Sequence, residues 1–374
     1  MNIAVIFGGE SCEHDISILT GVQLVLNCDE YIYNVFPVYI DKNGKWWTGN
    51  SLKDIDNYSS NHKKLKECCL IPGCDFLYIK KGKKYIKFVK IDCSILCLHG
   101  LRGEDGSVAS IMELSKIPYT NSSICASSIC LDKCLFKKIA FSLGCNVIDS
   151  VCINSNEFSY DYSMVETKIE HLGFPCIIKP ARLGSSIGIV VCENKENLYD
   201  SLKNAFIYDD KLLIEKFVDI KKEVNIALFS NKGEIVFSQT EEPISSDKIL
   251  SFENKYLKNP GGFETIKRIV PADISSIQNE QVNSMARGLY KELGMSGVVR
   301  FDFIIDNDDS VFINEVNTIP GSMANYLFDK SVYSYSKLID CWVKDAIWRK
   351  GKADKLLKVF DSSVLSSGNM GLKK

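Results

Sequence analysis

Long apolar segments are missing from this chain of 374 residues. No run reaches the roughly 18 consecutive apolar residues that a membrane-spanning helix needs, so we expect no transmembrane helix. After Met1 there is no basic segment and no long apolar segment of the kind found in signal peptides, because Ile3-Ala4-Val5-Ile6-Phe7 leads straight into Gly8-Gly9. We therefore expect a cytoplasmic protein.

An excess of charge of either sign is missing as well. The chain has 45 Lys and Arg and 47 Asp and Glu, which gives a net charge of −2. This near-neutral balance gives no electrostatic reason to expect nucleic acid or a membrane as a partner. Apolar residues make up 45% and charged residues 25%, as in an ordinary globular protein, and the length predicts two or three lobes.

No C-x-x-C pair occurs, although the chain contains 15 cysteines. The cysteine clusters therefore lack the ligand spacing of a zinc ribbon or finger. Disulfides are the other alternative, but the count is odd and a chain of this length buries a core without them. We expect reduced cysteines that pack mostly as small apolar side chains, among them Cys93 and Cys97 in an apolar run.

Segments of strand and helix character alternate along the chain, which predicts an α/β protein. They group into a first lobe over 1–121, a second over 122–219 and a third over 220–351, followed by a tail over 352–374. Strands are expected at 2–7, 33–40, 84–98 (two), 176–179, 187–191, 211–217, 223–230, 234–239, 297–305 and 310–316, and helices at 107–116, 127–143, 194–206, 275–293 and 334–349.

Two glycine-bearing loops follow strand-like segments in the first lobe. Gly8-Gly9 precede Glu13 at the start of an expected helix, where N–H groups favour an anion but where an acidic residue also simply suits the helix dipole. Residues 99–106 combine His99 and an arginine with three glycines and two carboxylates. Such loops bind ligands in α/β proteins, although a turn with solvated charges has the same composition. The full G-x-G-x-x-G pattern is absent, which disfavours a dinucleotide site.

Lys179 ends an apolar segment of the second lobe and is followed by Gly184-Ser185-Ser186. A lysine there can neutralise phosphate, and small loop residues expose N–H donors. The P-loop pattern is absent, and a plain hairpin would not need the lysine. Further on, Glu215 lies in an alternating segment and Glu223 follows it, which suits either a ligand-binding strand or a surface strand.

Two strand-like segments of the third lobe carry the most specific pattern. Arg300 and Asp302 lie on one face of the first, and Glu315 and Asn317 on one face of the second. Two carboxylates and an amide oxygen suit a Mg²⁺ ion that bridges nucleotide phosphates. Arg300 can hold a transferring phosphoryl group. A coincidentally polar sheet face is the alternative.

In this order the motifs resemble the D-alanine–D-alanine ligase family of the ATP-grasp superfamily, over residues 2 to about 345. The resemblance implies an α/β, three-lobed ATP-grasp fold with an N-terminal Rossmann-like (preATP-grasp) lobe, a central and a C-terminal ATP-grasp subdomain, and ATP between the second and third lobes. The matching motifs are Gly-Gly-x-Ser-x-Glu (8–13), His-Gly-x-x-Gly-Glu-Asp-Gly (99–106), Lys-Pro-x-x-x-Gly-Ser-Ser (179–186), Arg-x-Asp (300–302) and Asn-Glu-x-Asn-Thr-x-Pro-Gly (314–321).

The resemblance also implies roles for individual residues. In the nucleotide site, phosphate contacts are implied for Lys133, Lys179 and Lys255, adenine and ribose contacts for Glu215, Phe217, Val218 and Glu223, and ligation of two Mg²⁺ (or Mn²⁺) ions for Asp302, Glu315 and Asn317. In the amino-acid site, Arg300 and the Gly321 N–H resemble the stabilisers of the tetrahedral intermediate, Glu13 resembles the residue that holds the first D-alanine's ammonium, with Ser185 and Tyr256 as its partners, and His99 lies near the second amino acid. Residues 251–256 resemble the mobile loop that closes over ATP.

One position departs from the family pattern. Many members carry a serine five residues after the Pro-Gly pair, where it binds the acceptor carboxylate, and this chain has Tyr326. That carboxylate is then left to Ser322, to the Tyr326 hydroxyl or to another group. Tyr256 stands where ligases that form the D-lactate ester have histidine, which favours an amine acceptor.

We therefore expect ATP-dependent ligation of two D-alanines through an acyl phosphate, for peptidoglycan synthesis, by a homodimer. Such chemistry needs cations and N–H donors around developing charge rather than a protein nucleophile. A D-alanine–D-serine ligase or another ATP-grasp amino-acid ligase is the alternative enzyme. A regulatory protein without catalysis is expected to lack one of the four residues Arg300, Asp302, Glu315 and Asn317, all of which are present.

Overall fold

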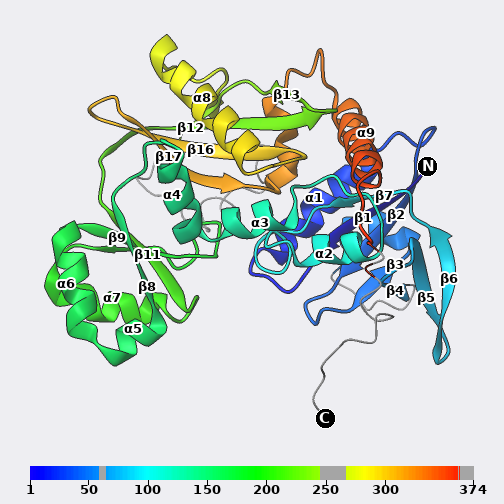
Figure 1. Ribbon diagram of the computed structural model, residues 1–374, viewed down its shortest axis with the longest axis horizontal. Coiled ribbons are helices and arrows are strands. Elements are labelled where there is room, and N and C mark those ends of the chain that lie inside the picture. Colours follow the sequence, from blue (N-terminus) through cyan, green and yellow to red (C-terminus); the bar gives the residue numbers. More distant parts are fainter. Residues whose placement is uncertain (59–64, 245–266, 361, 363–374) are drawn as a thin grey trace.

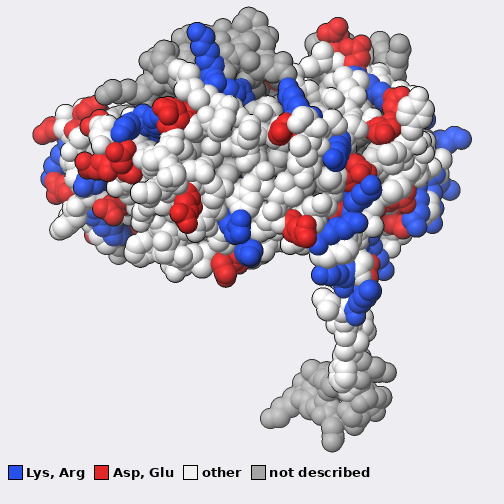
Figure 2. Space-filling view, turned by 90° about the horizontal axis from the view of Figure 1, so that it is seen from above, with Lys and Arg blue, Asp and Glu red and all other residues white. Residues whose placement is uncertain are grey.

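A computed structural model describes residues 1–58, 65–244, 267–360 and 362 (Figure 1). Three larger sheets with helices packed on them give the α/β architecture that the alternation predicts. Among the helices in these ranges, none combines the length and the apolar composition that crossing a membrane would require. Lys and Arg side chains are interspersed with Asp and Glu over the face in Figure 2, in keeping with the near-zero net charge.

The first sheet has the strand order β6-β5-β4-β3-β2-β1-β7 in the described residues. β1 (Asn2–Gly8) lies parallel to both neighbours, β2 (Asn34–Ile40) and β7 (Cys93–Leu96), and is buried along nearly its whole length, which explains its unbroken apolar run. The other elements are β3 (Trp46–Thr48), β4 (Lys66–Leu70), β5 (Phe76–Lys81), β6 (Lys84–Lys90), α1 (His14–Asn27), α2 (Ser107–Leu114) and the short 3₁₀ turns Asn50–Lys53 and Ile55–Tyr58.

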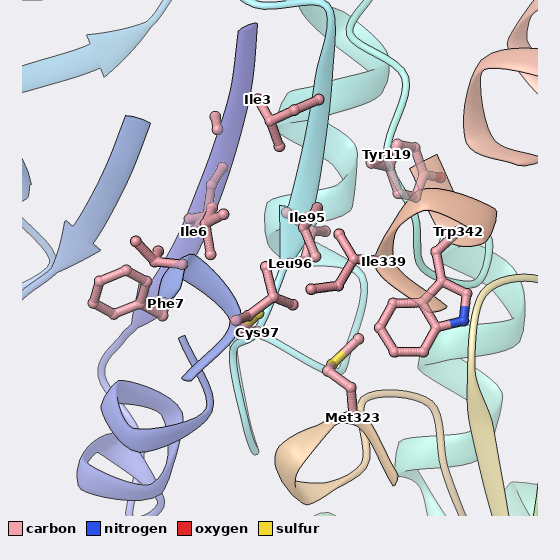
Figure 3. Close-up of a cluster of buried hydrophobic side chains, with 14 of the residues drawn as sticks. Ile3, Ile6, Phe7, Ile95, Leu96, Cys97, Tyr119, Met323, Ile339 and Trp342 are labelled. Atoms are coloured by element: carbon pink, nitrogen blue, oxygen red, sulfur yellow. The ribbon is translucent and has the colours of Figure 1, made fainter. Parts of the chain in front are cut away.

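The core of this sheet continues into the C-terminal helix and the third sheet. Ile339 and Trp342 of α9 (Tyr335–Ala353) belong to one buried cluster with Ile95 of β7 and with Met323 (Figure 3). Phe229, from the third sheet, belongs to the same cluster. Because burial of apolar area is the main stabilising term, this shared core holds the loops of the first sheet close to the third sheet.

The second sheet is antiparallel, with the order β10-β9-β11-β8. Its strands are β8 (Ser150–Asn154), β9 (Cys176–Pro180), β10 (Val190–Cys192) and β11 (Lys211–Lys216). Its helices α5 (Ser155–Tyr160), α6 (Tyr162–Leu172) and α7 (Leu198–Ala205) contribute to a separate core with the strands at the lower left of Figure 1. The turn Lys195–Asn197 precedes α7.

The third sheet is also antiparallel, with the order β13-β12-β16-β17. Its strands are β12 (Ile220–Asn231), β13 (Glu234–Phe237), β16 (Val299–Asp306) and β17 (Val311–Asn317), and α3 (Ile124–Leu131), α4 (Lys133–Ser142) and α8 (Ser276–Glu292) pack on it. β14 (Glu242–Pro243) and β15 (Arg268–Ile269) form a small ladder beside it, and Gly321–Leu327 is a turn after β17.

The helix expected at 127–143 is wrong as one element, because the chain bends at Asp132. The Asp132 carboxylate accepts a hydrogen bond from the Leu135 N–H at 3.0 Å and so caps a new helix, α4, that begins at Lys133. The strand expected at 187–191 lies later, at Val190–Cys192. Nine of the fifteen cysteines are buried, and Cys97 packs in the cluster of Figure 3.

Gly297 marks the closest approach of the segment after α2 to the start of β16. Its φ is +66°, and a Cβ there would lie 2.0 Å from the Thr120 carbonyl oxygen. The same junction is held by Ser122 Oγ, which donates to the Ser296 carbonyl at 2.8 Å, and by Ser296 Oγ, which donates to the Asn121 carbonyl at 2.9 Å.

Gly297→Ala is expected to lower the midpoint of thermal unfolding. A left-handed backbone costs an alanine about 1–2 kcal/mol, and the clash with a carbonyl adds about 1–3 kcal/mol. The matched control is Gly294→Ala, since Gly294 also has a positive φ, +58°, but open space around a Cβ. Equal melting temperatures for the two variants would contradict this account of the junction.

Candidate active site

A cavity of about 1730 Å³, counted with its open mouth, is lined by residues of all three sheets and their loops. Phe217 and Ser322 are described but do not line it, and Lys255 and Tyr256, with the rest of the expected loop over 251–256, lie outside the described residues. The expected site residues that line it are Glu13, His99, Lys133, Lys179, Ser185, Glu215, Val218, Glu223, Arg300, Asp302, Glu315, Asn317, Gly321 and Tyr326.

A buried carboxylate between two ammonium groups forms one wall. Glu215 of β11 pairs with Lys179 of β9 and with Lys137 of α4, and only 1% of the Glu215 side chain and 3% of the Lys137 side chain are exposed. Burial alone would raise the pKa of Glu215, but the two lysines outweigh it and hold that pKa at about 2. The cluster keeps one net positive charge in a low-dielectric wall, which suits a phosphate.

Lys133 begins α4 and extends the cationic wall toward the loop Gly184-Ser185-Ser186, the serine loop. Its Nζ donates to the Leu183 carbonyl at 2.6 Å and lies 3.7 Å from a Glu315 oxygen. Lys179 Nζ also donates to Asn314 Oδ1 at 3.3 Å. Lys133 from α4 and Lys179 from β9 therefore both reach β17 at the cavity lining.

The facing strands β16 and β17 present the acidic side of the cavity. Asp302 is paired in register with Glu315, and Arg300 with Asn317. Arg300 makes two hydrogen bonds of 2.7 Å to the Asp302 carboxylate, and the Asn317 amide donates to the same carboxylate at 3.0 Å. Burial opposes the charge on Arg300, yet Asp302 raises the pKa of the guanidinium well above its usual value.

Asp302, Glu315 and Asn317 fit a divalent cation that also takes oxygens from phosphate. Their register places two carboxylates and an amide on adjacent strands at the cavity wall. No group of three or more His, Cys, Asp or Glu within the described ranges forms a metal-binding cluster. A set with only two carboxylates therefore needs the oxygens of a bound phosphate to complete the coordination of a Mg²⁺ ion.

Glu13 is held by the serine loop. Ser185 Oγ donates a hydrogen bond to Glu13 Oε1, which brings together two residues that are far apart in sequence. The loop bends sharply, with φ of +54° at Ser185 and +60° at Ser186. Gly184 allows the approach, because a Cβ there would lie 3.1 Å from a Glu13 oxygen.

His99 is buried and neutral at physiological pH. Burial lowers the pKa of His99 to about 4; a hydrogen bond with the Ile319 backbone opposes this shift and the Arg300 charge adds to it. Its Nε2 lies 3.0 Å from Thr20 Oγ1, and the same hydroxyl accepts a hydrogen bond from the Ser322 N–H at 3.3 Å. α1 thus ties His99 to the turn that presents Gly321.

That turn is left-handed over three residues. Ser322, Met323 and Ala324 have φ values of +48°, +51° and +47°, a conformation that costs L-residues energy and is found at functional sites. The Ser322 hydroxyl donates to Gln23 Oε1 at 2.9 Å, and Tyr326 lines the cavity.

Sequence reasoning missed several residues that line or support the cavity, among them Lys137, Glu241 and Arg268. The helix expected over 127–143 already placed Lys137 on the same face as Lys133, four residues earlier, but no motif marked it. Arg268 and Glu241 flank residues 245–266 and line the cavity, and no motif in the sequence marks either of them.

Glu104 gives the site a pH signature. Burial, and next the Glu13 carboxylate, raise the pKa of Glu104 from 4.5 to about 8, while the Gly100 N–H donates to it at 3.0 Å. The unfolded chain releases this proton near pH 4.5, whereas the folded chain keeps it until about pH 8. This carboxyl therefore makes the protein less stable as the pH rises through that window.

Glu104→Gln should remove this loss of stability. The free energy of unfolding of the variant, relative to the unsubstituted protein, is expected to rise between about pH 5 and pH 8, by at most about 1.4 kcal/mol per pH unit for one proton. Urea unfolding at several pH values measures it, with the exposed Glu193→Gln as control. Parallel pH profiles for E104Q and the unsubstituted protein would contradict the assignment.

Comparisons with known proteins agree with this geometry. The family model described as "D-ala D-ala ligase N-terminus" matches residues 2–122, and the model described as "D-ala D-ala ligase C-terminus" matches residues 139–344. Together they cover most of the chain, and of the residues that line the cavity only Lys133 lies between the two matched segments.

Individual relatives match over nearly their whole length. A D-alanine–D-alanine ligase of Thermosipho melanesiensis is 33% identical over 373 residues, 98% of each chain, and one of Caldicellulosiruptor bescii is 35% identical over 367 residues, 96% of this chain and 98% of the relative. The crystal structure of a D-alanine–D-alanine ligase from Helicobacter pylori is similar with a TM-score of 0.74 and 28% identity, over 92% of this chain and 98% of that one. This chain belongs to the D-alanine–D-alanine ligase family.

Proposed function

We propose that this protein is an ATP-dependent ligase that converts ATP and two D-alanines into ADP, phosphate and D-alanyl-D-alanine for peptidoglycan synthesis. The observation that carries the proposal is one cavity whose lining brings together the cations Lys133 and Lys179, the Arg300–Asp302 pair and Glu13. Membership of the family supports the same activity.

The nucleotide occupies the side of the cavity between the second and third sheets in this proposal. Lys133 and Lys179 neutralise its phosphates, because a dry wall strengthens each charge interaction. Lys137 keeps Glu215 ionised and in place. The adenine and ribose lie against Glu215, Phe217, Val218 and Glu223, of which Phe217 contributes from outside the cavity lining.

Asp302, Glu315 and Asn317 would hold two Mg²⁺ (or Mn²⁺) ions. When bound, these ions neutralise charge on the nucleotide phosphates. Lys255, in the loop over 251–256, reaches the γ-phosphate in the proposal, and Tyr256 joins Ser185 beside Glu13.

The amino-acid end of the cavity provides orientation and charge stabilisation. Glu13 takes the ammonium of the first D-alanine, whose carboxylate accepts the γ-phosphoryl group and becomes an acyl phosphate. The amine of the second D-alanine attacks this carbonyl carbon and phosphate leaves. Arg300 and the Gly321 N–H donate to the oxygen that gains negative charge, and His99, neutral, lies near the second amino acid.

The biological setting belongs to the same proposal. The protein works in the cytoplasm as a homodimer, and its three lobes are 1–121, 122–219 and 220–351, with a tail over 352–374. The sheets described above are each built from one of these three stretches, which supports the division, while α9 packs its apolar face on the first sheet.

The direct test is phosphate release with ATP and a panel of D-amino acids, followed by mass spectrometry of the product. Release is expected only when ATP and D-alanine are both present, and the product should be the D-alanine dipeptide. With D-serine added, a mixed D-alanyl-D-serine product as the main species would favour the alternative ligase. No release with D-alanine, D-serine or D-lactate would refute the proposal.

Lys179→Met tests the cationic wall. The substitution keeps the volume and removes the charge, so turnover should fall by about a hundredfold or more, as for other groups that stabilise a charged transition state. Lys138→Met is the matched control, because Lys138 is exposed on the outer face of α4. Near-UV circular dichroism checks folding, and folded K179M with full turnover would contradict the assignment.

A further inference from the structure

A guanidinium stacked on an aromatic ring lies in the wall of the cavity at its amino-acid end. The Arg268 guanidinium carbon lies 4.3 Å from the centre of the Tyr326 ring, and both residues line the cavity. Arg268 comes from β15, directly after residues 245–266, and Tyr326 comes from the left-handed turn after Gly321. Two separate segments therefore meet beside the reaction centre.

Glu241 fixes the orientation of this arginine. Arg268 Nη1 lies 3.4 Å from Glu241 Oε2, and the Asn225 amide donates to Glu241 Oε1 at 2.9 Å. The Tyr326 hydroxyl donates to the same Oε1 at 3.5 Å. Only 5% of the Glu241 side chain and 19% of the Arg268 side chain are exposed, so the guanidinium is held between a carboxylate and a ring.

The other cations of the cavity have different surroundings. Within the described residues, five Lys and Arg side chains line it; Lys179 and Lys216 lie on strands of the second sheet and Lys133 lies at the start of α4. Arg300 makes two hydrogen bonds to Asp302. Arg300 also interacts electrostatically with Tyr326 and Glu241, but Arg268 is the cation whose guanidinium stacks on the ring of Tyr326, at the position where the sequence departs from the family pattern.

Of the carboxylates of the two amino-acid substrates, only one keeps its charge and needs a cation throughout the reaction. The carboxylate of the first amino acid is consumed in the acyl phosphate, whereas that of the second stays ionised through the reaction and into the product. A guanidinium has five N–H donors in a rigid plane, and this fork matches a carboxylate with two parallel hydrogen bonds. A ring and a carboxylate that hold the plane reduce the entropy lost on binding.

We propose that Arg268, held by Tyr326 and Glu241, binds the carboxylate of the acceptor amino acid and sets the requirement for that carboxylate. The proposal rests on the ligase activity proposed above. Arg268 and Arg300 together balance Glu241 and Asp302, so the cluster has no net charge. The acceptor carboxylate is then recognised by the geometry of the Arg268 guanidinium and not by long-range attraction. Because no excess positive charge holds the product, the product can dissociate.

The test measures acceptor choice rather than turnover alone. D-Alaninamide has the amine of D-alanine but no ionised carboxylate, so it can act as an acceptor and not as a donor. With both present, mass spectrometry gives the ratio of D-alanyl-D-alanine to its amide. Arg268→Gln is expected to lower this ratio by about tenfold to a hundredfold, the value of one charge-assisted hydrogen bond or more.

Matched variants separate this role from a structural one. Lys267→Gln removes a neighbouring, exposed charge and should keep the ratio of the unsubstituted protein. Tyr326→Ala should lower the ratio as Arg268→Gln does, and Tyr326→Phe, which keeps the ring, should restore most of it. The KM for ATP should stay constant across the set.

The outcomes are distinct. A ratio for R268Q within about twofold of the unsubstituted protein would overturn the proposal, since one lost charge-assisted bond predicts more. If R268Q does not fold, Arg268→Lys is decisive: its KM for the acceptor should rise with an unchanged KM for ATP, and an unchanged acceptor KM would overturn the proposal. Absence of any phosphate release by the unsubstituted protein would instead refute the ligase activity.

Discussion

The burial of one carboxylate between two ammonium groups constrains the whole cavity. Glu215 is nearly inaccessible, and an unpaired charge in that place would cost several kcal/mol, so Lys137 and Lys179 have to stay within contact. This requirement fixes α4, β9 and β11 relative to one another. The two lysines neutralise the buried carboxylate and leave one positive charge over. The same cluster that keeps Glu215 stable can therefore also bind a polyphosphate.

Strained backbone shapes two loops of the cavity where we propose that the amino acids bind. The loop at Ser185 and the turn at Ser322 both contain consecutive left-handed residues that are not glycine, which costs energy that the surrounding packing must offset. Each bend delivers a polar group to the cavity: a hydroxyl to Glu13 in the first case and the backbone next to Gly321 in the second. The apolar cluster around Trp342 anchors the second turn through Met323.

Sequence patterns predicted well the strands whose apolar residues either run unbroken or alternate with polar ones. β1, β16 and β17 appear close to their expected positions because apolar runs and alternation report burial directly. β4 and β5 were not predicted, since the first is a short strand whose cysteines obscure the alternation. α5 and α6 were not predicted, although Val165, Ile169 and Leu172 give α6 the helical spacing of a buried face. The break at Asp132 depends on a capping bond that propensity alone does not reveal.

The same distinction applies to the site. Residues within one motif, such as Arg300 and Asp302, could be grouped because a strand puts alternate residues on one face. Arg268 and Tyr326 are 58 positions apart, by 326 − 268, and they stack on each other only in the folded structure. The sequence did mark Tyr326 as a departure from the family pattern, but its partner follows an irregular stretch without periodicity. A departure from the pattern that looks isolated in the sequence is therefore best interpreted through its contacts: the ring of Tyr326, where many family members have serine, gives Arg268 a fixed orientation.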